Sequence, residues 1–508
     1  MELQIPIFLI ISIIFILSLL NLINRFHTSR SSRPRLPPGP WKLPLIGSLH
    51  HLSGGSLPQY ALRNLARKYG PIMHLQLGEI SAVVISAPRV AKELLTAHDL
   101  AFSSRPRLPS LDAQICFSEL LSSKNVRSFS TIRDEVAMNL VESIRLHPTS
   151  IPIDLTQVAF SYANDVVCRA AFGMSHGGKD EVLPLIIELG ASAGGFDVAD
   201  LFPSVKFLED VTGLKTKYLK LHHKMDHVWN VIIDQHMEKL RFGQPGEEDL
   251  VDVLLRCKQK GNLEFPITMD SIKATILVRT AHKFSTHIRL ALELIMAPPS
   301  PHNPQDMFNA GTHTSASTVE FAMAEMIKHP KVMEKAQAEL RHVFRGNDRV
   351  FESELEKVSY LKMVIRETLR LHPPVPLLLP RECQDWQKVC GYDIPPKTRV
   401  LVNALAINRD PEYWDDAEAF EPERFAGSGI EFIGTNFEFI PFGGGRRMCP
   451  GISFVLATVE LLLAQLLYHF NWELPDGLQP QDLDMTEILG LAAKRKNDLY
   501  LVATSHKS

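Results

Sequence analysis

The stretch Pro441-Phe442-Gly443-Gly444-Gly445-Arg446-Arg447-Met448-Cys449-Pro450-Gly451 decides the fold of this chain. It places one cysteine in a glycine-rich loop, and residues 452–470, which are apolar at helical spacing, follow it. Cys449 is therefore expected at or just before a helix N-terminus, where the helix dipole and the backbone N–H groups favour an anion. A thiolate there is stabilised against protonation and can bind a metal. With Arg447 as a cation for a neighbouring carboxylate, the loop indicates a haem iron held by a cysteine thiolate.

The overall composition gives no support for a nucleic-acid partner. The chain has 508 residues and a formal net charge of −3, and it contains no basic stripe with interleaved aromatic residues. Length alone allows about three domains, but one large enzyme with a single core is also compatible with it. The six cysteines show no paired metal spacing and suit a reducing cytosol better than a disulfide framework.

The N-terminus carries an apolar run over residues 3–23 with few polar interruptions. At about 1.5 Å per residue, this run just spans a ~30 Å hydrocarbon core. Glu2 precedes it and four arginines follow it, so the positive-inside rule predicts a lumenal N-terminus and a cytosolic remainder. A cleaved signal peptide is the alternative, but the run is long for one and lacks a small-residue cleavage site. We therefore predict a single-pass anchor over residues 1–24.

The segment after the anchor predicts a spacer that leads into one catalytic domain. Pro37, Pro38 and Pro40 cannot continue a helix, so residues 25–42 are expected to form a stiff, basic and proline-rich hinge. Residues 43–508 are then predicted to form the globular part of the protein.

Helical periodicity dominates this globular part. It is present in six ranges, which are 90–98, 155–172, 214–240, 310–327, 360–371 and 452–470. Alternating or β-branched segments at 71–77 and 82–86, on either side of Gly78, predict a hairpin. Short strands are expected at 400–405 and 499–502. The pattern predicts a mainly α fold with small β-sheets.

Three shorter motifs precede the cysteine loop. Ala310-Gly311-Thr312-His313-Thr314-Ser315 lies in a predicted helix and combines a glycine with several hydroxyl side chains. Glu367 and Arg370 are three residues apart and share one face of another helix. Pro422-Glu423-Arg424-Phe425 stands between that helix and the loop. Taken alone, the glutamate–arginine pair is common, and on a surface it contributes only about 0–1 kcal/mol.

Together with the cysteine loop, these motifs resemble the cytochrome P-450 family. All five positions of its F-x-x-G-x-R-x-C-x-G signature are filled, by Phe442, Gly445, Arg447, Cys449 and Gly451. The opening segment 36–47 and the tail 484–498 are similar to the plant microsomal branch, and within it to enzymes that hydroxylate terpenoids. The resemblance covers nearly the whole chain. It implies the cytochrome P-450 fold, as a single large domain behind an N-terminal transmembrane helix in the endoplasmic reticulum membrane.

The resemblance also implies how haem b would be held. Cys449 would be the axial ligand of the haem iron. Arg447 and Arg381 match positions that bind haem propionates. The cofactor-binding set is completed by the other signature residues, Phe442, Gly445 and Gly451.

Two further groups of residues acquire roles from the resemblance. Glu367, Arg370 and Arg424 match a buried structural triad behind the haem. Gly311 would open the helix groove for dioxygen, and Thr314 would hydrogen-bond the oxygen that is being activated. His313 occupies a position that is acidic in the family; a histidine can relay protons near neutral pH but lacks the charge of a carboxylate.

The activity implied is that of a monooxygenase supplied with electrons from NADPH by a membrane-bound NADPH–cytochrome P-450 reductase. One atom of O2 would enter a small hydrophobic plant metabolite, a terpenoid being the class indicated, and the other would leave as water. The expected partners are therefore the reductase, membrane lipid, O2 and this substrate. Two alternatives stay open: a catalytically impaired splice or gene-model variant, and a haem-thiolate isomerase or dehydratase that needs no reductase. The presence of Thr314 argues against the isomerase or dehydratase.

Two segments depart from the family pattern. The family has a W-x-x-x-R helix after the segment that matches residues 102–106, whereas this chain has no tryptophan between Trp41 and Trp229. Residues 278–305 interrupt a family-like helix with 28 residues that include four prolines. A tolerated surface loop would explain the second departure. We favour a retained intron, because Val278 can be encoded by a codon that starts with GT and Gln305 by one that ends with AG.

Overall fold

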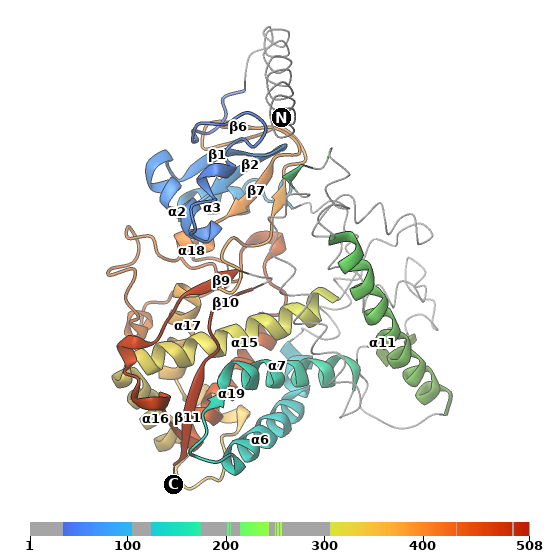
Figure 1. The fold of residues 1–508 in the computed structure, drawn as a ribbon, viewed down its shortest axis with the longest axis vertical. Helices are drawn as coiled ribbons and strands as arrows, with labels where there is room; N and C mark the ends of the chain where they lie inside the picture. Colours follow the sequence, from blue (N-terminus) through green and yellow to red (C-terminus); the bar gives the residue numbers. More distant parts are fainter. Residues whose placement is uncertain are drawn as a thin grey trace, which may run out of the picture.

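The computed structural model of the chain describes residues 34–103, 123–173, 201–202, 204, 214–242, 249, 251–252, 255–256, 305–432, 434–489 and 492–506. These residues form a sheet-containing lobe and a larger helical lobe (Figure 1). The observed fold is mainly helical with small sheets, as predicted. The predicted anchor, the first part of the hinge, the site of the missing W-x-x-x-R helix and nearly all of the predicted insert lie outside the described residues.

The helices and strands are as follows. The α-helices are α2 (Pro58–Tyr69), α3 (Pro88–Thr96), α5 (Ser123–Ser128), α6 (Ser130–Leu146), α7 (Leu155–Phe172), α11 (Leu214–Phe242), α15 (Gln305–Lys328), α16 (Pro330–Val343), α17 (Tyr360–Leu371), α18 (Ala404–Ile407) and α19 (Ile452–His469). The strands are β1 (Ile72–Leu77), β2 (Ile80–Ile85), β3 (Ile153–Asp154), β4 (Arg381–Glu382), β5 (Gln387–Val389), β6 (Tyr392–Ile394), β7 (Arg399–Val402), β8 (Phe470–Glu473), β9 (Glu487–Leu489), β10 (Ala493–Arg495) and β11 (Tyr500–Ser505).

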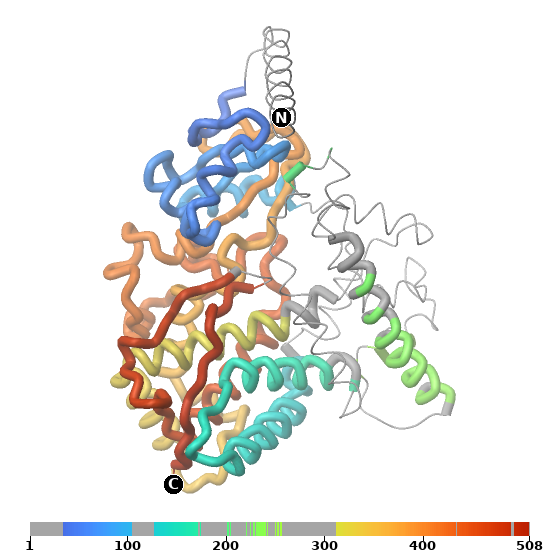
Figure 2. The backbone as a smooth tube through the Cα atoms, in the orientation of Figure 1, coloured from blue at the N-terminus to red at the C-terminus, as the bar shows by residue number. Residues whose placement is uncertain are grey.

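The largest sheet has the strand order β1-β2-β7-β4. The predicted hairpin is confirmed as the antiparallel pair β1–β2, with Met73 opposite Val84. Strand β7 then joins β2 in parallel, with Val83 opposite Val400, so that residues more than 300 positions apart share one sheet. A second long-range pairing closes the helical lobe, where β11 lies between β3 and β8. Figure 2 shows this last strand, in red, beside the teal segment that contains β3 and α7.

The strand expected at 400–405 is partly wrong. Strand β7 ends at Val402, and Ala404–Ile407 form α18 instead. The cause is Asn403, whose side-chain oxygen accepts a hydrogen bond of 3.1 Å from the backbone N–H of Ala406. An asparagine in this position caps a helix start and therefore ends the strand before it.

The described part of the hinge packs on the sheet. The backbone N–H of His74 donates to the carbonyl of Pro38 at 2.8 Å, and that of Asp393 donates to the carbonyl of Arg35 at 2.8 Å. Gly39 is pressed against the carbonyl of His74, where a Cβ would collide. This part of the hinge is therefore not a free spacer, because its backbone is bonded to β1 and to β6.

The helical lobe is built around α19, which is buried along most of its length. By length and composition, it is the one helix among the described residues that could cross a membrane, but 72% of it is buried inside the protein. Helices α6, α15 and α16 cover it. A helix that is apolar all round suits such a central position. Because α19 begins at Ile452, the burial of this helix also fixes the position of the loop that precedes it.

A buried histidine joins three elements, α17, α15 and β9. His372, at the C-terminus of α17, contacts Glu325 of α15 through Nε2 at 2.7 Å and Glu487 of β9 through Nδ1 at 2.9 Å. The ring of Phe321 stacks on it at 4.2 Å between centroids. Since both ring nitrogens face carboxylates, both donate and the ring carries a positive charge.

The pKa values in this cluster follow from the contacts. Burial alone would lower the pKa of His372, but the hydrogen bonds from its ring to Glu325 and Glu487 raise it. Burial would raise the pKa of Glu325, yet its hydrogen bonds with His329 and His372 lower it to about 2. The pKa of Glu487 is lowered in the same way by His372, against the effect of burial.

Replacing His372 by Gln is expected to destabilise the protein in a pH-dependent way. The raised pKa of His372 gives stability that is complete below pH 6.5, the ordinary histidine value, and is lost as the pH rises through the folded-state pKa. The lowered pKa values of the two glutamates give stability that is present above pH 4.5 and lost as the pH falls. The difference in thermal midpoint between wild type and H372Q should thus be largest between these two pH values. A difference that stays constant from acidic to alkaline pH, as expected for the exposed control His342→Gln, would contradict this.

Candidate functional site

The cysteine loop is closed by its own backbone. The N–H of Cys449 donates to the carbonyl of Phe442 at 2.9 Å, and that of Met448 donates to Gly445 at 3.0 Å. Gly451 caps α19, so Cys449 lies two residues before the helix cap, as predicted. The backbone N–H of Gly451 hydrogen-bonds to the thiol sulfur. The sulfur therefore faces a helix N-terminus, and the cysteine keeps partial exposure.

Burial changes the expected acidity of this thiol. The sequence predicted a thiol with a lowered pKa, because of the helix terminus. In the structure, burial raises the pKa of Cys449, and the hydrogen bond from Gly451 only partly opposes this. The helix terminus alone is thus not enough to ionise the thiol, whereas a metal ion bonded to the sulfur would do so.

Arg381 and Arg447 meet the loop from the side. Arg381 in β4 is 4% exposed and donates from Nη2 to the carbonyl of Gly444 at 3.0 Å. Arg447 donates from Nη1 to the carbonyl of Pro380 at 3.1 Å. The structure thereby brings together the two arginines that the sequence predicted as binders of carboxylates, with Cys449 two residues beyond Arg447.

The remaining signature residues shape the backbone of the loop. Gly445 has φ +66°, and a Cβ there would lie 2.5 Å from the carbonyl oxygen of Leu95 and 2.6 Å from Oδ1 of Asp99. Only glycine fits this close approach to the end of α3. Phe442 packs edge-on against the ring of Phe432, at 5.3 Å between centroids. The aromatic side chain thus anchors the start of the loop in the helical lobe.

Helix α15 offers a narrow accessible face next to α19. Between residues 311 and 327, Gly311 and Thr314 keep partial exposure and all other residues are buried. They are three positions apart and so share one side of the helix. A Cβ at Gly311 would lie 3.2 Å from Cγ2 of Val167, so this glycine also lets α7 pack closely on α15.

His313 lies on a different side of α15. Its side chain is buried, and its ring meets that of Phe160 of α7 edge-on at 5.2 Å between centroids. Successive residues of a helix point about 100° apart. The structure therefore does not bring His313 onto the accessible face of Gly311 and Thr314, although the three are adjacent in sequence.

Glu367, Arg370 and Arg424 form one buried cluster. The carboxylate of Glu367 accepts from Arg370 Nε at 2.7 Å and from Arg424 Nε at 3.0 Å. Glu367 and Arg370 are completely buried, and the side chain of Arg424 is 10% exposed. Arg370 also donates to three carbonyl groups of the segment before the cysteine loop, those of Asn408, Ala417 and Ala419. The cluster holds this segment against α17.

This arrangement agrees with a comparison with known protein families. The family model described as Cytochrome P450 matches residues 37–281 and 302–502. The chain belongs to the cytochrome P450 family. Premnaspirodiene oxygenase of Hyoscyamus muticus is 49% identical over 94% of both chains. The 5-epiaristolochene 1,3-dihydroxylase of Nicotiana tabacum is 47% identical over 94% of both. A cytochrome P450 of Panax ginseng is 45% identical over 100% of this chain and 99% of its own.

Family membership makes this P450 a monooxygenase of the branch that includes terpenoid hydroxylases, and it implies a haem iron cofactor. The family model matches two ranges of the chain and leaves residues 282–301 between them unmatched. This gap falls inside the insert expected at 278–305.

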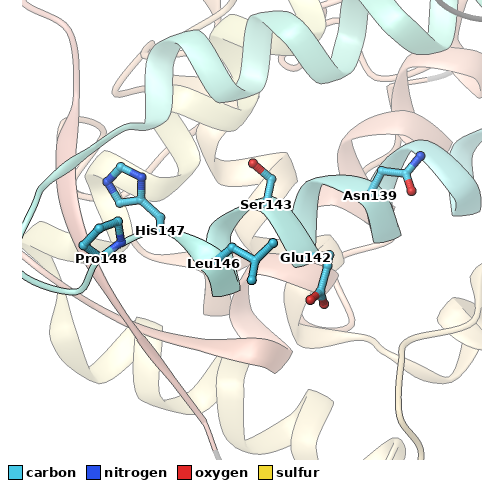
Figure 3. A pocket seen from close by; sticks show the side chains of 6 residues that line it. All are labelled: Asn139, Glu142, Ser143, Leu146, His147 and Pro148. Carbon is cyan, nitrogen blue, oxygen red and sulfur yellow. The ribbon is translucent and has the colours of Figure 1, made fainter.

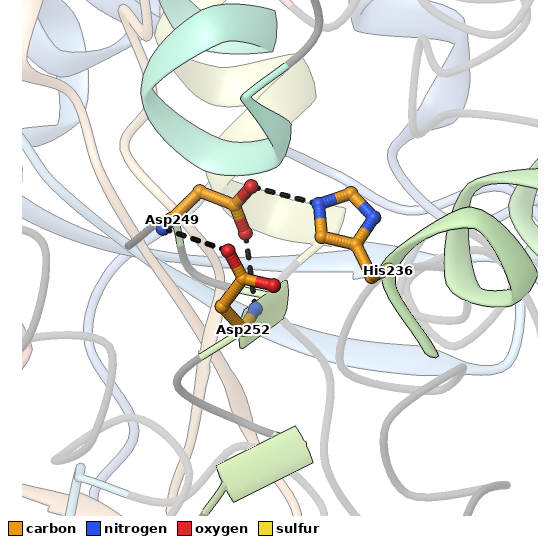
Figure 4. Close-up of side chains that lie close together, drawn as sticks. All are labelled: His236, Asp249 and Asp252. Atoms are coloured by element: carbon orange, nitrogen blue, oxygen red, sulfur yellow. Dashed lines mark hydrogen bonds and ion pairs between the residues drawn. The ribbon is translucent and has the colours of Figure 1, made fainter. Parts of the chain in front are cut away.

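Two other features of the P450 lie apart from the loop. His236, Asp249 and Asp252 are the group of side chains among the described residues that stand close enough to hold a metal ion (Figure 4). His236, however, contacts the carbonyl of Ile232 and the carboxylate of Asp249, each at 2.7 Å, so both ring nitrogens donate. Burial would lower the pKa of His236, but these contacts raise it. His236 and Asp249 therefore form a buried ion pair, and Asp252 is joined to Asp249 by hydrogen bonds to backbone N–H groups.

A surface hollow lies at the end of α6 (Figure 3). It is lined by Asn139, Glu142, Ser143, Leu146, His147 and Pro148. The hollow is open to solvent, and none of the residues predicted for the site contributes to it.

Removing the charge of Glu367 is expected to be strongly destabilising. In Glu367→Gln, two guanidinium groups stay largely buried without their carboxylate, which costs about 3–5 kcal/mol in comparable cases. Urea unfolding of the purified protein measures the loss. The control is Glu354→Gln, which removes a more exposed ion pair of 3.0 Å with Lys357 and should change stability by less than about 1 kcal/mol. Equal effects of the two substitutions would show that the cluster does not hold the fold.

Proposed function

We propose that this cytochrome P450 is a haem-thiolate monooxygenase that hydroxylates a small hydrophobic plant terpenoid with O2. Electrons come from NADPH through NADPH–cytochrome P-450 reductase. The observation that carries the proposal is the position of Cys449, a partly exposed thiol before α19 that accepts a hydrogen bond from Gly451. Two relatives of the chain are named as a premnaspirodiene oxygenase and a 5-epiaristolochene 1,3-dihydroxylase. The substrates in these names support a terpenoid as the class of substrate.

The residues around the loop fit a haem. Cys449 would supply the axial sulfur, and the metal would offset the effect of burial that otherwise keeps the thiol protonated. Arg381 and Arg447 approach the same loop from one side and would bind the two propionate groups of a haem. Gly445 and its neighbours keep the loop flat against α3. When bound, haem would supply the redox-active iron with which dioxygen is cleaved.

Helix α15 would form the opposite side of the site. It packs against α19, and between residues 311 and 327 its accessible face consists of Gly311 and Thr314. The Thr314 hydroxyl would hold and pass a proton at this face. His313 would act differently, since its ring packs against Phe160. We therefore assign the proton-handling role to Thr314 and a packing role to His313, while Glu367, Arg370 and Arg424 support the loop from behind.

The proposal also includes a location in a membrane. Residues 1–24 would anchor the chain in the endoplasmic reticulum membrane, residues 25–42 would lead to the globule, and the catalytic domain would face the cytosol. The apolar run, the arginines after it and the likeness to plant P450 enzymes support this. The partners would be the reductase, membrane lipid, O2 and the terpenoid.

A second candidate is a catalytically impaired variant of such an enzyme. The alignment with the Panax ginseng relative has 535 positions, which is 27 more than this chain has residues, so the relative contains segments that are missing here. The family model also skips residues 282–301. Both observations favour a chain that lost the W-x-x-x-R helix and gained a foreign segment at 278–305 through splicing or a gene-model error. A reductase-independent isomerase or dehydratase is the third candidate, and Thr314 argues against it.

A carbon-monoxide difference spectrum of the reduced protein tests these candidates. The monooxygenase predicts a strong band at the thiolate-ligated position and turnover of a terpenoid substrate that needs NADPH and reductase. Absence of haem uptake would refute the active enzyme, and a strong band together with reductase-dependent product formation would refute the impaired variant. Turnover that persists without reductase would point to the isomerase or dehydratase. The control is Cys449→Ser, which should abolish the thiolate-type band.

Thr314 and His313 should respond differently to substitution. In Thr314→Ala, loss of the hydroxyl is expected to divert electrons, so that hydrogen peroxide rises per NADPH consumed and product falls by about 10²-fold or less. His313→Gln keeps a polar side chain against Phe160 and should retain the wild-type ratio of product to NADPH. The measurement is this ratio in the reconstituted system. A larger loss in His313→Gln than in Thr314→Ala would reverse the assignment.

A further inference from the structure

Asp99 is a buried carboxylate that no sequence motif singles out. It follows α3 by three residues, is 8% exposed, and lies between the buried Leu95 and Phe102 of the sheet lobe. A carboxylate in such a place is costly unless it is paired and hydrogen-bonded. The partners of Asp99 therefore show what holds it there.

The first partner is the backbone of the cysteine loop. Oδ2 of Asp99 accepts from the backbone N–H of Arg446 at 2.9 Å and lies 3.4 Å from Nε of the same arginine. Oδ1 lies so near Gly445 that any Cβ at this glycine would meet it at 2.6 Å. The carboxylate thus binds the turn at Arg446, three residues before Cys449.

The second partner is Arg381. Its Nη1 lies 3.5 Å from Oδ1 of Asp99, and its Nη2 donates to the carbonyl of Gly444 at 3.0 Å. Arg381 and the loop are therefore tied to each other directly and again through Asp99. This matters because the loop leads into α19 of the helical lobe, whereas Asp99 and Arg381 belong to the sheet lobe.

We propose that Asp99 is the positioning residue that fixes the cysteine loop and Arg381 relative to each other for haem binding. The proposal rests on the proposed haem-thiolate function. Asp99 does not touch the reacting atoms; it acts through the Arg446 amide and the Arg381 guanidinium. Because the sequence has no tryptophan between Trp41 and Trp229 for a W-x-x-x-R motif, Arg381 and Arg447 are the remaining predicted propionate ligands, and the carboxylate that positions Arg381 gains importance.

Thiol alkylation tests whether Asp99 holds the cysteine loop, and it does not require bound haem. In the full-length chain, freed of haem and treated with iodoacetamide, Asp99→Asn should raise the alkylation rate of Cys449 by about tenfold, the effect of replacing a charged acceptor of the Arg446 N–H by a neutral one and of losing the ion pair with Arg381. The rates of Cys390 and of the buried Cys168 should stay unchanged.

Glu93→Gln is the matched control, on the helix α3 that precedes Asp99. Glu93 accepts from the backbone N–H of Cys390 at 2.8 Å and does not contact the cysteine loop through any bond of the described residues. This substitution should raise the rate of Cys390 and leave that of Cys449 unchanged. If the alkylation rates of all three cysteines rise in Asp99→Asn, the variant is generally unfolded. In that case Arg381→Lys tests the same contact through the other partner, because it removes the hydrogen bond of Arg381 to the carbonyl of Gly444. The proposal is overturned if Cys449 stays at its wild-type rate in the folded variant.

Haem retention supplies the second readout. The rate of haem transfer to apomyoglobin should rise about tenfold in Asp99→Asn, with a larger share of the neutral-thiol carbon-monoxide band, and should stay at the wild-type value in Glu93→Gln. In an Arg381→Gln background, Asp99→Asn should add less than it does alone, because the two act as one unit. A wild type that takes up no haem refutes the proposed function and leaves the alkylation result standing. A haem-binding wild type with an unaffected Asp99→Asn overturns the role of Asp99.

Discussion

The buried carboxylate of Glu367 is the interaction on which the site depends. It binds two arginines at once, and Arg370 passes the constraint on to three carbonyl groups of the segment that leads to the cysteine loop. The described residues between 408 and 441 form turns and one short 3₁₀ helix, Pro422–Phe425, rather than strands or α-helices. Their path is therefore set by hydrogen bonds to charged side chains, which are roughly twice as strong as neutral ones. The position of the cysteine loop therefore depends on the position of this segment.

Local patterns predicted a large part of the fold. Helices α7 and α17 have the predicted bounds, and α19 begins where the apolar spacing after Cys449 begins. Each of these rests on signals contained within one segment, such as periodicity or a capping glycine. Where a single side chain altered the local balance, prediction failed, as with Asn403, which ends β7 and starts α18. The hinge was also predicted only in part, because its docking on β1 and β6 depends on distant partners.

The candidate site was predicted as a set of residues but not as a geometry. A motif shows that Arg381, Arg447 and Cys449 belong together, yet it does not show that Asp99, 347 positions before Arg446, holds them. Nor does it show that burial raises the pKa of the thiol against the helix terminus, or that His313 faces α7. These properties arise from packing between segments far apart in sequence, which a local pattern does not contain.

The uniform apolarity of α19 has a consequence for how the chain is made. With the proposed membrane location, the chain would be synthesised at a membrane, where the translocation machinery responds to hydropathy and not to the final position of a segment. Helix α19 satisfies the same criterion of length and composition as a membrane span. In such a chain, early enclosure of α19 by α6, α15 and α16 would keep this segment in the globule and out of the lipid.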